Sequence, residues 1–473
     1  MPHDLRQTAA WQALDLLAPA FDETPRISRA AGLTLDLTTA GYDGAVQQQL
    51  FALAEELNWS SARDDLLSGA HVNTSENQAA LHTAMRAAGD KIPPAVKGDV
   101  LAARAAIQTC LAKVQAIGAL DIIHVGLGGS GLAPLFLRSF FQGAQGVSGS
   151  NYRLHIIVNA DPVTLRRIQQ QCDPRKTIVV IASKTFTTDE TMLVANQLKT
   201  WLGDLRRMFA VTLQAPLAEK FGVPKDHIIP LPEWLGGRFS LWGGVAFPIL
   251  LTFGPQQFEQ LQQGARKMDE HFASAPAEES LPLLLALAHI WQQNFMGCRT
   301  RVIIPYADAL RHLPAYLQQL EMESNGKACV VPTAPAIFGG VGSTVQHSFM
   351  QWMHQGSDLA ATDFVVADRL PGEAALSEVL RRNALAQSAA LAHGAPPEFP
   401  GGRPSNMVFL PELSPAALGA LLALYEHKVY LEAHIWGINC FDQPGVELGK
   451  KLARQISTGD IPRSTGARLA RYK

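Results

Sequence analysis

The sequence predicts an α/β protein with two parallel-sheet units, each an αβα sandwich, and a helical N-terminal section. Short apolar runs rich in β-branched residues alternate with helix-like stretches from residue 120 onward, and the same alternation begins again near residue 286. Strands that alternate with helices form parallel sheets that are covered on both faces. The residues before 116 instead show the apolar spacing of amphipathic helices.

This pattern divides the chain into four sections. Residues 1–115 form the helical section, which we expect to pack on the second unit. The first unit, residues 116–285, contains the expected strands DIIHVGL, LHIIVNA, TIVVIAS and MFAVTLQ. The second unit, residues 286–450, contains RVIIPY, ACVVPT and DFVVAD, and its stretch 415–438 has the length and apolar content of a major buried helix. Residues 451–473 form a C-terminal tail.

The composition excludes several classes of protein. Of 473 residues, 47% are hydrophobic and 17% are charged, which is typical of a globular protein and not of a disordered or membrane-embedded one. The 40 Lys and Arg residues nearly balance the 42 Asp and Glu residues, so we expect no dedicated nucleic-acid binder. The N-terminus has no signal-peptide pattern, and no stretch approaches the roughly 20 apolar residues of a membrane span. We therefore expect a cytoplasmic protein that has no membrane partner.

The cysteines give the same indication about the compartment. There are five of them, an odd number, and no two form a CxxC pair. This distribution predicts reduced, mostly buried thiols, and neither a disulfide framework nor a zinc site. The five are Cys110, Cys172, Cys298, Cys329 and Cys440.

Two junctions between a strand and a helix carry hydroxyl-bearing and glycine residues. In IASKTFTTDETM (181–192), Ser183, Lys184, Thr185 and Thr188 follow an apolar strand and precede a helix. GLGGSG (126–131) is a junction of the same type. Ligands of open parallel sheets bind beyond the carboxyl ends of strands, where hydroxyls and free helix N–H groups suit a phosphate.

Such residues also have simpler roles, because Ser and Thr cap helices and glycines form turns. Either junction alone would leave both interpretations open. Together, and without the GxxxxGK[ST] or GxGxxG pattern, they favour a small phosphorylated ligand over a nucleotide.

Four further stretches give the chain a family resemblance. They are GGRFSLWGG (236–244), LQQLEMESNGK (317–327), QHSFMQWMHQG (346–356) and YEHKVYLEAHIWGINCFDQPGVELGK (425–450). With the two junctions, in this order, they closely resemble the glucose-6-phosphate isomerase family. The resemblance implies two sugar-isomerase (SIS-type) domains and interconversion of D-glucose 6-phosphate and D-fructose 6-phosphate, a step of glycolysis and gluconeogenesis. In the family the sugar ring opens and a proton moves between C2 and C1 through a cis-enediol, without a metal or an organic cofactor.

The resemblance assigns four catalytic side chains. Glu323 in MESNGK matches the base, near the end of a predicted helix that Gly326 would terminate. Arg238 in GGRFSLW matches the arginine beside the enediolate, where a permanent positive charge stabilises the anion. His347 matches the ring-opening acid and base, and the residues GST before it predict a helix N-terminus. Lys450, which closes FDQPGVELGK, matches a lysine near the ring and C1 oxygens.

The resemblance also implies the residues that bind the substrate and its phosphate. Gln319 lies four residues before Glu323 and so on the same helix face. Pro444 suits a first helical position, which makes Gln443 the cap of that helix. The implied binding set is Gly129, Ser130, Ser183, Lys184, Thr185, Thr188, Gly237, Gln319 and Gln443.

Three positions depart from the family pattern. Gly131 stands where the family usually carries Asp, and Gln78 stands where it usually carries Arg. The loop AIFGGVGSTV (336–345) before His347 also differs from the usual sequence. None of these departures removes one of the four catalytic side chains.

The resemblance finally implies the assembly. Family members are homodimers in which the histidine matched by His347 reaches into the neighbouring subunit's site, so we expect shared active sites. Two alternatives remain open from the sequence. One is a broader aldose–ketose 6-phosphate isomerase that also accepts mannose 6-phosphate, and the other is a non-catalytic sugar-phosphate sensor.

Overall fold

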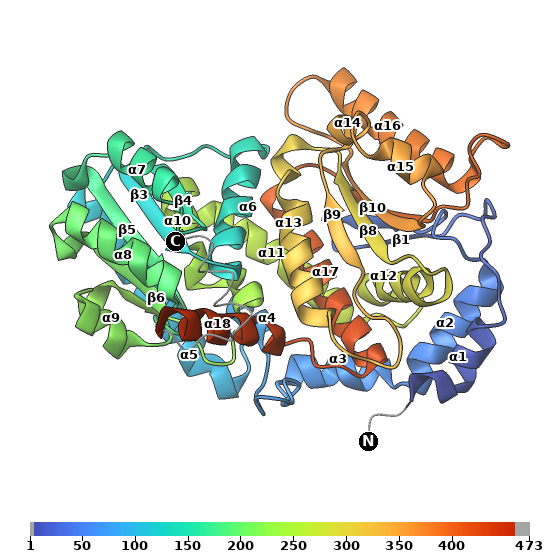
Figure 1. The fold of residues 1–473 in the computed structure, drawn as a ribbon, viewed down its shortest axis with the longest axis horizontal. Coiled ribbons are helices and arrows are strands. Elements are labelled where there is room, and N and C mark those ends of the chain that lie inside the picture. The colour runs from blue at the N-terminus through green and yellow to red at the C-terminus, as the bar shows by residue number, and fades with distance from the viewer. Residues whose placement is uncertain (1–3, 459–473) are drawn as a thin grey trace.

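The computed structural model describes residues 4–458 and contains two lobes, each built around one sheet (Figure 1). The first sheet has five strands in the order β4-β3-β5-β6-β7, and all neighbouring pairs are parallel. Its strands are β3 (Asp121–Gly126), β4 (Arg153–Ile157), β5 (Thr177–Ala182), β6 (Met208–Thr212) and β7 (Ile228–Pro230).

Both faces of this first sheet are covered, which explains its strongly apolar strands. All six residues of β5 are buried, with Ile178 and Val180 in one core cluster and Val179 and Ile181 in another. Successive strand residues point to opposite faces, so a strand with helices on both sides is apolar throughout. The four predicted strands of this unit are therefore confirmed. The helices that cover the sheet are α5 (Lys97–Ile117), α6 (Gly129–Gly143), α7 (Pro162–Gln171), α8 (Asp189–Leu202), α9 (Ala215–Phe221) and α10 (Phe247–Phe253).

The second sheet has six strands in the order β1-β2-β11-β10-β8-β9. Four of them are parallel to one another, whereas β2 is antiparallel to both β1 and β11. The strands are β1 (Ile27–Ala30), β2 (Leu33–Asp36), β8 (Thr300–Pro305), β9 (Ala336–Gly339), β10 (Ala360–Ala367) and β11 (Ser405–Leu410). The α/β class with largely parallel sheets is thus as predicted.

The N-terminal section is mostly helical, but it also supplies the β1–β2 hairpin to the second sheet, which the helical interpretation missed. Ala31 and Gly32 connect the two strands with φ angles of 50° and 80°, as in the two-residue turns that favour hairpins. Leu33 and Leu35 alternate with partly exposed residues. Each of these strands has four residues, which is too short for its alternation to be recognised in the sequence beside the longer helical pattern around it.

The expected strand ACVVPT (328–333) is wrong. This segment is a loop, and the neighbouring strand is β9. The Thr333 hydroxyl accepts a hydrogen bond from the Lys327 amide at 3.3 Å and donates to the Lys327 carbonyl at 3.0 Å, which closes the loop on itself. Pro332 has no N–H to give to a ladder, and Val330 is 51% exposed, so the apolar run belongs to no sheet.

A long buried helix, α17 (Pro415–Trp436), lies in the middle of the molecule and confirms the helix expected over 415–438 (Figure 1). It packs on α11 (Pro255–Ser274) and α12 (Leu281–Ile290). At the crossing with α11, a Cβ on Gly419 would lie 1.8 Å from the Leu261 carbonyl oxygen. Only glycine permits so close an approach of two helix backbones.

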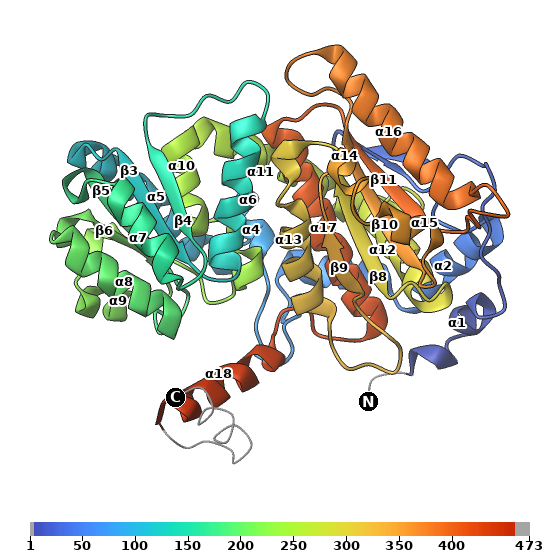
Figure 2. The same cartoon turned by 45° about the horizontal axis from the view of Figure 1, so that its top comes forward.

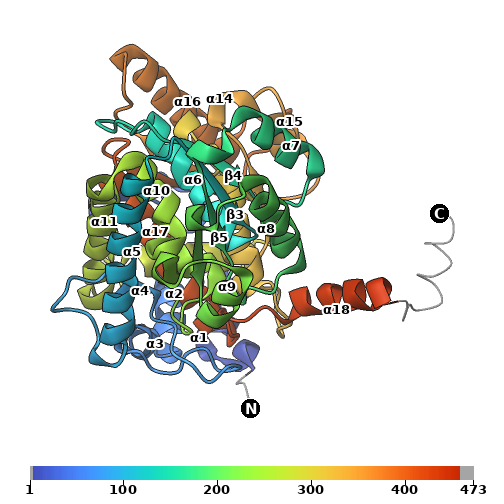
Figure 3. The ribbon, with the colours of Figure 1, turned by 90° about the vertical axis from the view of Figure 1, so that its left-hand side faces the viewer.

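The last helix, α18 (Pro444–Thr458), projects from the body (Figures 2 and 3). It begins at Pro444, as predicted, and exposes Val446, Leu448, Leu452 and Ile456. The remaining helices are α1 (Ala9–Leu14), α2 (Gly44–Glu56), α3 (Trp59–Ser68), α4 (His82–Arg86), α13 (Leu313–Gln318), α14 (Gly342–Val345), α15 (Met350–Gln355) and α16 (Ala374–His393).

Within residues 4–458, one segment, Pro94–Ile117, has the length and apolar composition that a membrane crossing requires. It consists of α5 and the turn before it. Because α5 packs against β7 through buried residues such as Val100, Ala103 and Ile107, it is explained as a covering helix of the first sheet.

Candidate active site

The two predicted phosphate junctions lie side by side at the carboxyl edge of the first sheet. Gly126 at the end of β3 pairs in register with Ala182 at the end of β5. The chain leaves β3 through Gly128 into α6, and it leaves β5 through residues 183–188 into α8. The N-termini of α6 and α8 therefore open on the same space, where their free N–H groups favour an anion.

The loop after β5 is held in a fixed shape by its own side chains. The buried Ser183 hydroxyl accepts a hydrogen bond from the Phe186 amide at 3.1 Å, and Phe186 has a φ of 52°. The Thr187 hydroxyl donates to the Thr185 hydroxyl at 2.9 Å. Thr188 occupies the cap position of α8, but its side chain makes no capping bond there. A positive φ on a bulky residue is unusual and is maintained by surrounding structure, often at binding sites.

Lys184 ties this loop to the chain segment that precedes Arg238. Its ammonium group donates to the Glu233 carbonyl at 2.7 Å, and burial lowers its pKa. The ammonium group of Lys184 thus points to the segment before Arg238, and its contact with a phosphate stays a prediction.

The glycine loop after β3 packs directly against two other predicted segments. A Cβ on Gly129 would lie 2.4 Å from the Gly237 carbonyl oxygen, and a Cβ on Gly128 would lie 3.2 Å from Gln319 Nε2. At Gly131 a Cβ would lie 2.1 Å from the Gly126 carbonyl oxygen, so this backbone has no room for the Asp that the resemblance led us to expect.

Glu323 lies on a widened helical turn that faces these loops. Helix α13 continues into a π-helical turn over Gln319–Glu323, and the helix ends before Gly326, as predicted. The carboxylate is 24% exposed and accepts a hydrogen bond from Gln319 Nε2 at 2.8 Å. π-helical turns are rare and occur frequently at functional sites.

Arg238 lies on a 3-10 helix, Gly237–Trp242, and its guanidinium is almost completely buried. Its Nη1 lies 3.3 Å from Glu323 Oε1 and donates to Gln443 Oε1 at 2.9 Å. Its Nε donates to the Ser324 hydroxyl at 2.6 Å. Burial lowers the pKa of Arg238, but a guanidinium remains charged in proteins.

The other edge of the guanidinium is bound by backbone. Nη2 of Arg238 donates to the Cys440 carbonyl and, at 3.2 Å, to the Asp442 carbonyl. Lys327 also bonds the Asp442 carbonyl, at 3.1 Å, and forms an ion pair with its carboxylate at 3.1 Å. Arg238 therefore joins Glu323 to the segment that carries Gln443.

Beneath Glu323 lies a buried network of charged residues that the sequence analysis did not assign. Lys428 Nζ lies 2.7 Å from Glu321 and 2.9 Å from Glu432, and all three side chains are buried. Asn325 Nδ2 donates to the Val429 carbonyl at 3.0 Å. These contacts fix the turn that carries Glu323 to α17. The MESNGK and YEHKVYLEAH stretches contain these residues, but only the fold places them in contact.

A second buried network supports the 3-10 helix that carries Arg238. Trp242 Nε1 donates to Glu426 at 2.7 Å, and Arg86 stacks on the Trp242 ring at 4.4 Å. Arg86 also forms ion pairs with Glu426 and, at 2.6 Å, with Asp269. Burial alone would raise the pKa of Asp269, but Arg86 outweighs that effect and holds it at about 2.

Of the predicted catalytic residues, His347 is not brought to this group, and the side chain of Lys450 is not among the described ones. His347 is exposed in the turn between α14 and α15, and within the described residues no hydrogen bond or ion pair joins its side chain to another residue. A helix, α14, does begin at Gly342 as the residues GST predict, but it is a single turn that ends at Val345. His347 therefore lies beyond it, in a turn where its N–H donates to the Thr344 carbonyl at 3.1 Å. Lys450 belongs to α18, and its side chain lies outside the described residues.

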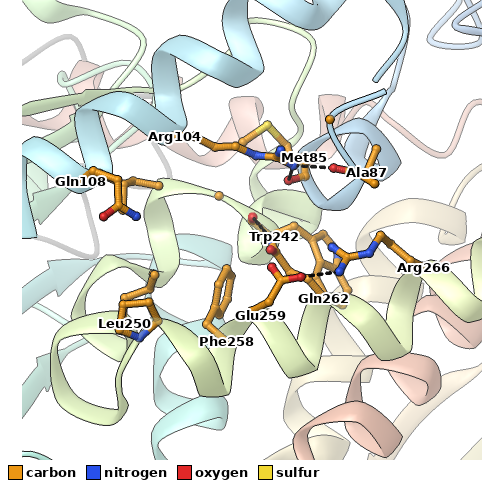
Figure 4. A pocket seen from close by; sticks show the side chains of 15 residues that line it. Met85, Ala87, Arg104, Gln108, Trp242, Leu250, Phe258, Glu259, Gln262 and Arg266 are labelled. Carbon is orange, nitrogen blue, oxygen red and sulfur yellow. Dashed lines mark hydrogen bonds and ion pairs between the residues drawn. The ribbon is translucent and has the colours of Figure 1, made fainter. Parts of the chain in front are cut away.

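A cavity of about 400 Å³ is lined in part by Trp242, the last residue of the 3-10 helix that carries Arg238 (Figure 4). None of the residues that line it is a predicted site residue. Figure 4 shows that its charged groups are already paired, since Arg266 contacts Glu259 and Arg104 donates to the Ala87 carbonyl at 2.7 Å. We therefore place the candidate active site at the group of residues around Glu323 and Arg238, and not in this cavity.

Comparison with known proteins identifies the family. The phosphoglucose isomerase family matches residues 36–465. The glucose-6-phosphate isomerase of Stenotrophomonas maltophilia (strain R551-3) is 41% identical over 460 residues, which cover 93% of this chain and 90% of that protein. The enzyme of the same name from Xanthomonas axonopodis pv. citri (strain 306) is 39% identical, with 96% of this chain and 93% of that protein covered.

Solved structures agree with the sequence matches. A glucose-6-phosphate isomerase from Chlamydia trachomatis superposes with a TM-score of 0.88 at 29% identity, covering 99% of this chain and 100% of that one. A hypothetical protein from Thermus thermophilus gives a TM-score of 0.68 at 27% identity, covering 86% of this chain and 96% of that one. The resemblance inferred from the motifs is confirmed, and the chain belongs to the phosphoglucose isomerase family.

Proposed function

We propose that this protein interconverts D-glucose 6-phosphate and D-fructose 6-phosphate by ring opening and proton transfer through a cis-enediol. One observation carries the proposal. A carboxylate, Glu323, lies 3.3 Å from a buried guanidinium, Arg238, and both adjoin a pair of helix N-termini that suit a phosphate. Family membership supports the same reaction.

The proton transfer needs a base and a stabilised anion. Glu323 takes the proton from C2 of the open-chain aldose and returns it to C1, while the hydroxyl proton on O2 passes to O1, so that the carbonyl group moves from C1 to C2. Negative charge develops on the enediolate oxygens in between. Arg238 carries a positive charge in an orientation fixed by Ser324, Gln443 and two backbone carbonyls, so it stabilises that anion without having to reorient.

Phosphate binding holds the sugar in place. Ser130, Ser183, Thr185 and Thr188 supply hydroxyls, Lys184 supplies charge, and the N-termini of α6 and α8 supply N–H groups. Gln319 lies between these loops and Glu323. Its Nε2 donates to the Glu323 carboxylate, and the same atom would lie 3.2 Å from a Cβ on Gly128. Gly129 packs directly against the Gly237 backbone, and the space beside Gly237 itself is open to a ligand that approaches closely.

A coupled assay tests the function. Purified protein is given glucose 6-phosphate, fructose 6-phosphate or mannose 6-phosphate, and formation of the isomer is followed through a dehydrogenase or kinase that uses only the product. Conversion between the first two alone supports the proposal, and conversion of mannose 6-phosphate as well supports the broader isomerase. Binding of all three without conversion would identify a sensor and contradict the proposal.

The hydroxyl cluster makes a separate prediction. We expect the double substitution Thr185→Ala and Thr188→Ala to weaken binding of both substrate and inorganic phosphate, because each hydrogen bond to a charged phosphate contributes about 1.5–3 kcal/mol. Inhibition by inorganic phosphate measures this directly. Thr200→Ala, on the exposed face of the same helix α8, is the matched control and should leave inhibition unchanged. An unchanged inhibition constant in the double variant would place the phosphate elsewhere.

We also propose that the protein is a homodimer whose active sites are shared. His347 is exposed, and within the described residues no hydrogen bond or ion pair joins it to Glu323, which suits a side chain that serves a neighbouring subunit. The projecting helix α18 exposes Leu448, Leu452 and Ile456 at four-residue spacing on one face, which suits a contact surface. Two-fold symmetry would then give each site one histidine from the partner subunit.

Mixing inactive subunits tests this arrangement. Subunits with Glu323→Gln and subunits with His347→Ala are co-expressed, so that about half of the dimers are hybrids. In a hybrid, one site holds both defects and the other holds neither, so about a quarter of the wild-type activity should return. Zero recovery, with the hybrid verified by mass, would contradict a shared site. If Glu323 and His347 of one site came from the same chain, every site of a hybrid would carry one of the two defects and none would be active.

We further propose that the protein acts in the cytoplasm, in glycolysis and gluconeogenesis, and without nucleic acid, membrane, metal or organic cofactor in its reaction. The five cysteines are all free thiols, four of them buried, which suits a reducing compartment. Fractionation of cells with an antibody against the chain tests the location.

A further inference from the structure

Three potential metal ligands converge at the amino edge of the first sheet, away from the active site. Asp121 begins β3, His155 lies on β4, and Cys172 directly follows α7. His155 Nε2 lies 3.4 Å from Cys172 Sγ and 3.2 Å from Asp121 Oδ1. All three ligand atoms lie within 4.8 Å of one another. We call these residues the edge cluster.

Two ligand separations in the edge cluster are close to those of a tetrahedral zinc site. Zinc bonds of about 2.0–2.1 Å to nitrogen, 2.0–2.2 Å to oxygen and 2.3 Å to sulfur, at tetrahedral angles, separate the ligand atoms by roughly 3.3–3.6 Å. The separations of 3.4 Å and 3.2 Å lie close to that range. One nitrogen, one oxygen and one sulfur are also ligand types that zinc accepts together.

A single ring nitrogen, His155 Nε2, faces both the thiol and the carboxylate of the edge cluster. A neutral imidazole has either a hydrogen or a lone pair on Nε2, and the same Nε2 faces both the thiol and the carboxylate. With a hydrogen on Nε2, imidazole and thiol both donate to Asp121, and Nε2 and Sγ lie in contact as two donors. With a lone pair on Nε2, the thiol can donate to it, but the carboxylate then faces another acceptor. A cation between the three atoms bonds all of them at once.

The charges of the edge cluster also suit a divalent cation. Asp121 is fully buried, and its outer side is bound by Arg153, whose Nε and Nη2 donate to its two oxygens at 2.8 Å and 2.7 Å. This contact orients the carboxylate, as partners of metal ligands commonly do. The negative charges of a thiolate and a carboxylate offset a divalent ion, and the Arg153 guanidinium then leaves a net charge of +1. The His155 side chain is 18% exposed, so an ion can reach the cluster from solvent.

A second group of ligand types shows the contrast. His289, Glu321 and Glu432 also converge, and all are buried. There, however, Lys428 Nζ lies 2.7 Å from one glutamate and 2.9 Å from the other, so the chain supplies its own cation. In the edge cluster the cation supplied by the chain is the Arg153 guanidinium, which contacts Asp121 from its outer side, and among the described residues no ammonium or guanidinium group lies in ion-pair or hydrogen-bond contact with Cys172 or His155.

We propose that the edge cluster binds one divalent transition-metal ion of the zinc type, with Asp121, His155 and Cys172 as protein ligands and water in the fourth position. The ion would join β3, β4 and the end of α7. Because Asp121 starts the strand whose other end leads into the glycine loop, the ion lies at the opposite edge of the sheet from the phosphate site. The sequence pattern gave no sign of it, since the three ligands come from separate elements and form no CxxC pair.

Cobalt provides the probe. The full-length protein is freed of metal with a chelator and titrated with Co²⁺, which takes the place of zinc and absorbs in the near ultraviolet when a thiolate binds it. We expect saturation at one ion per chain, a thiolate-to-cobalt band, and loss of the band when Zn²⁺ is added. Isomerase activity should stay unchanged throughout, so this test is independent of the proposed reaction.

Variants identify the ligands. Cys172→Ser should abolish the near-ultraviolet band, and His155→Gln should weaken Zn²⁺ binding by more than about 100-fold, since even loss of an indirect partner weakens binding by 10–100-fold. Cys329→Ser is the matched control, because this partly exposed thiol donates to the Trp436 carbonyl outside the cluster. It should keep both the band and the affinity.

The outcomes that overturn the proposal are definite. They are the absence of a thiolate band in the wild-type protein at excess Co²⁺, or a band that persists in Cys172→Ser. Should Cys172→Ser fail to fold, X-ray absorption of the Zn²⁺-loaded wild-type protein replaces it. One sulfur among the zinc ligands, with binding weakened in His155→Gln, supports the edge cluster, and no sulfur overturns it.

Discussion

Glu323→Gln is expected to lower kcat by about 10²- to 10⁴-fold while substrate affinity stays nearly unchanged. The amide has the size of the carboxylate, but it cannot accept a proton from C2. It still has an oxygen for one of the two donors, Arg238 Nη1 or Gln319 Nε2, that now bond the carboxylate. Steady-state kinetics in both directions measure kcat, and inhibition by an aldonate 6-phosphate measures binding.

A matched control separates this effect from a general loss of charge. Glu219→Gln changes an exposed glutamate on α9, far along the sheet from the site, and should leave kcat unchanged. Isotope exchange adds a second measurement, because the wild-type protein should incorporate solvent deuterium at C2 and the variant should not. Activity of Glu323→Gln within tenfold of wild type would rule out Glu323 as the base.

The fold was predictable where burial on both faces imposes a simple pattern. The strands β3, β5 and β6 are buried at every residue, so they are visible as apolar runs in the sequence. Short strands are different. Strand β7 has three residues, and β1 and β2 have four residues each. Such short segments become strands only because a neighbouring strand is present to pair with them.

The apolar run ACVVPT shows the opposite error. Its composition is typical of a strand, but Pro332 and the Lys327–Thr333 hydrogen bonds close it as a loop. The hydrophobic pattern predicts which residues can be buried. Whether such a segment forms a strand depends on whether the fold places a partner strand beside it.

The site was predictable to the extent that its motifs are local. The contacts among Gly129, Gly237, Gln319, Glu323 and Arg238 join residues that the sequence had already singled out. The supporting charges were not predictable, because Lys428 and Glu321 are 107 positions apart and look like solvated helix residues in the sequence. Only the fold shows that both are buried and paired.

Arg238→Lys is expected to be the second most damaging substitution at the site. Lysine keeps the charge but loses the planar fork that reaches Ser324, Gln443 and two backbone carbonyls at once. We expect kcat to fall by about 10²- to 10³-fold, the usual effect of removing one fixed donor from a developing anion. The Michaelis constant should change little, because the phosphate loops are untouched. Arg382→Lys, on the helix α16 away from the site, is the matched control.

Chemical rescue distinguishes this electrostatic role from a structural one. In Arg238→Ala the space of the buried guanidinium is left open, and guanidinium ion added to the solution can enter it and restore the positive charge beside Glu323. We expect kcat of this variant to rise with guanidinium concentration and to saturate, at concentrations too low to unfold the protein. The same ion should leave the kcat of Glu323→Gln unchanged, since that variant lacks the base and not the charge. If guanidinium restores the melting temperature of Arg238→Ala without restoring its kcat, Arg238 holds the segments around Glu323 together and does not stabilise the enediolate.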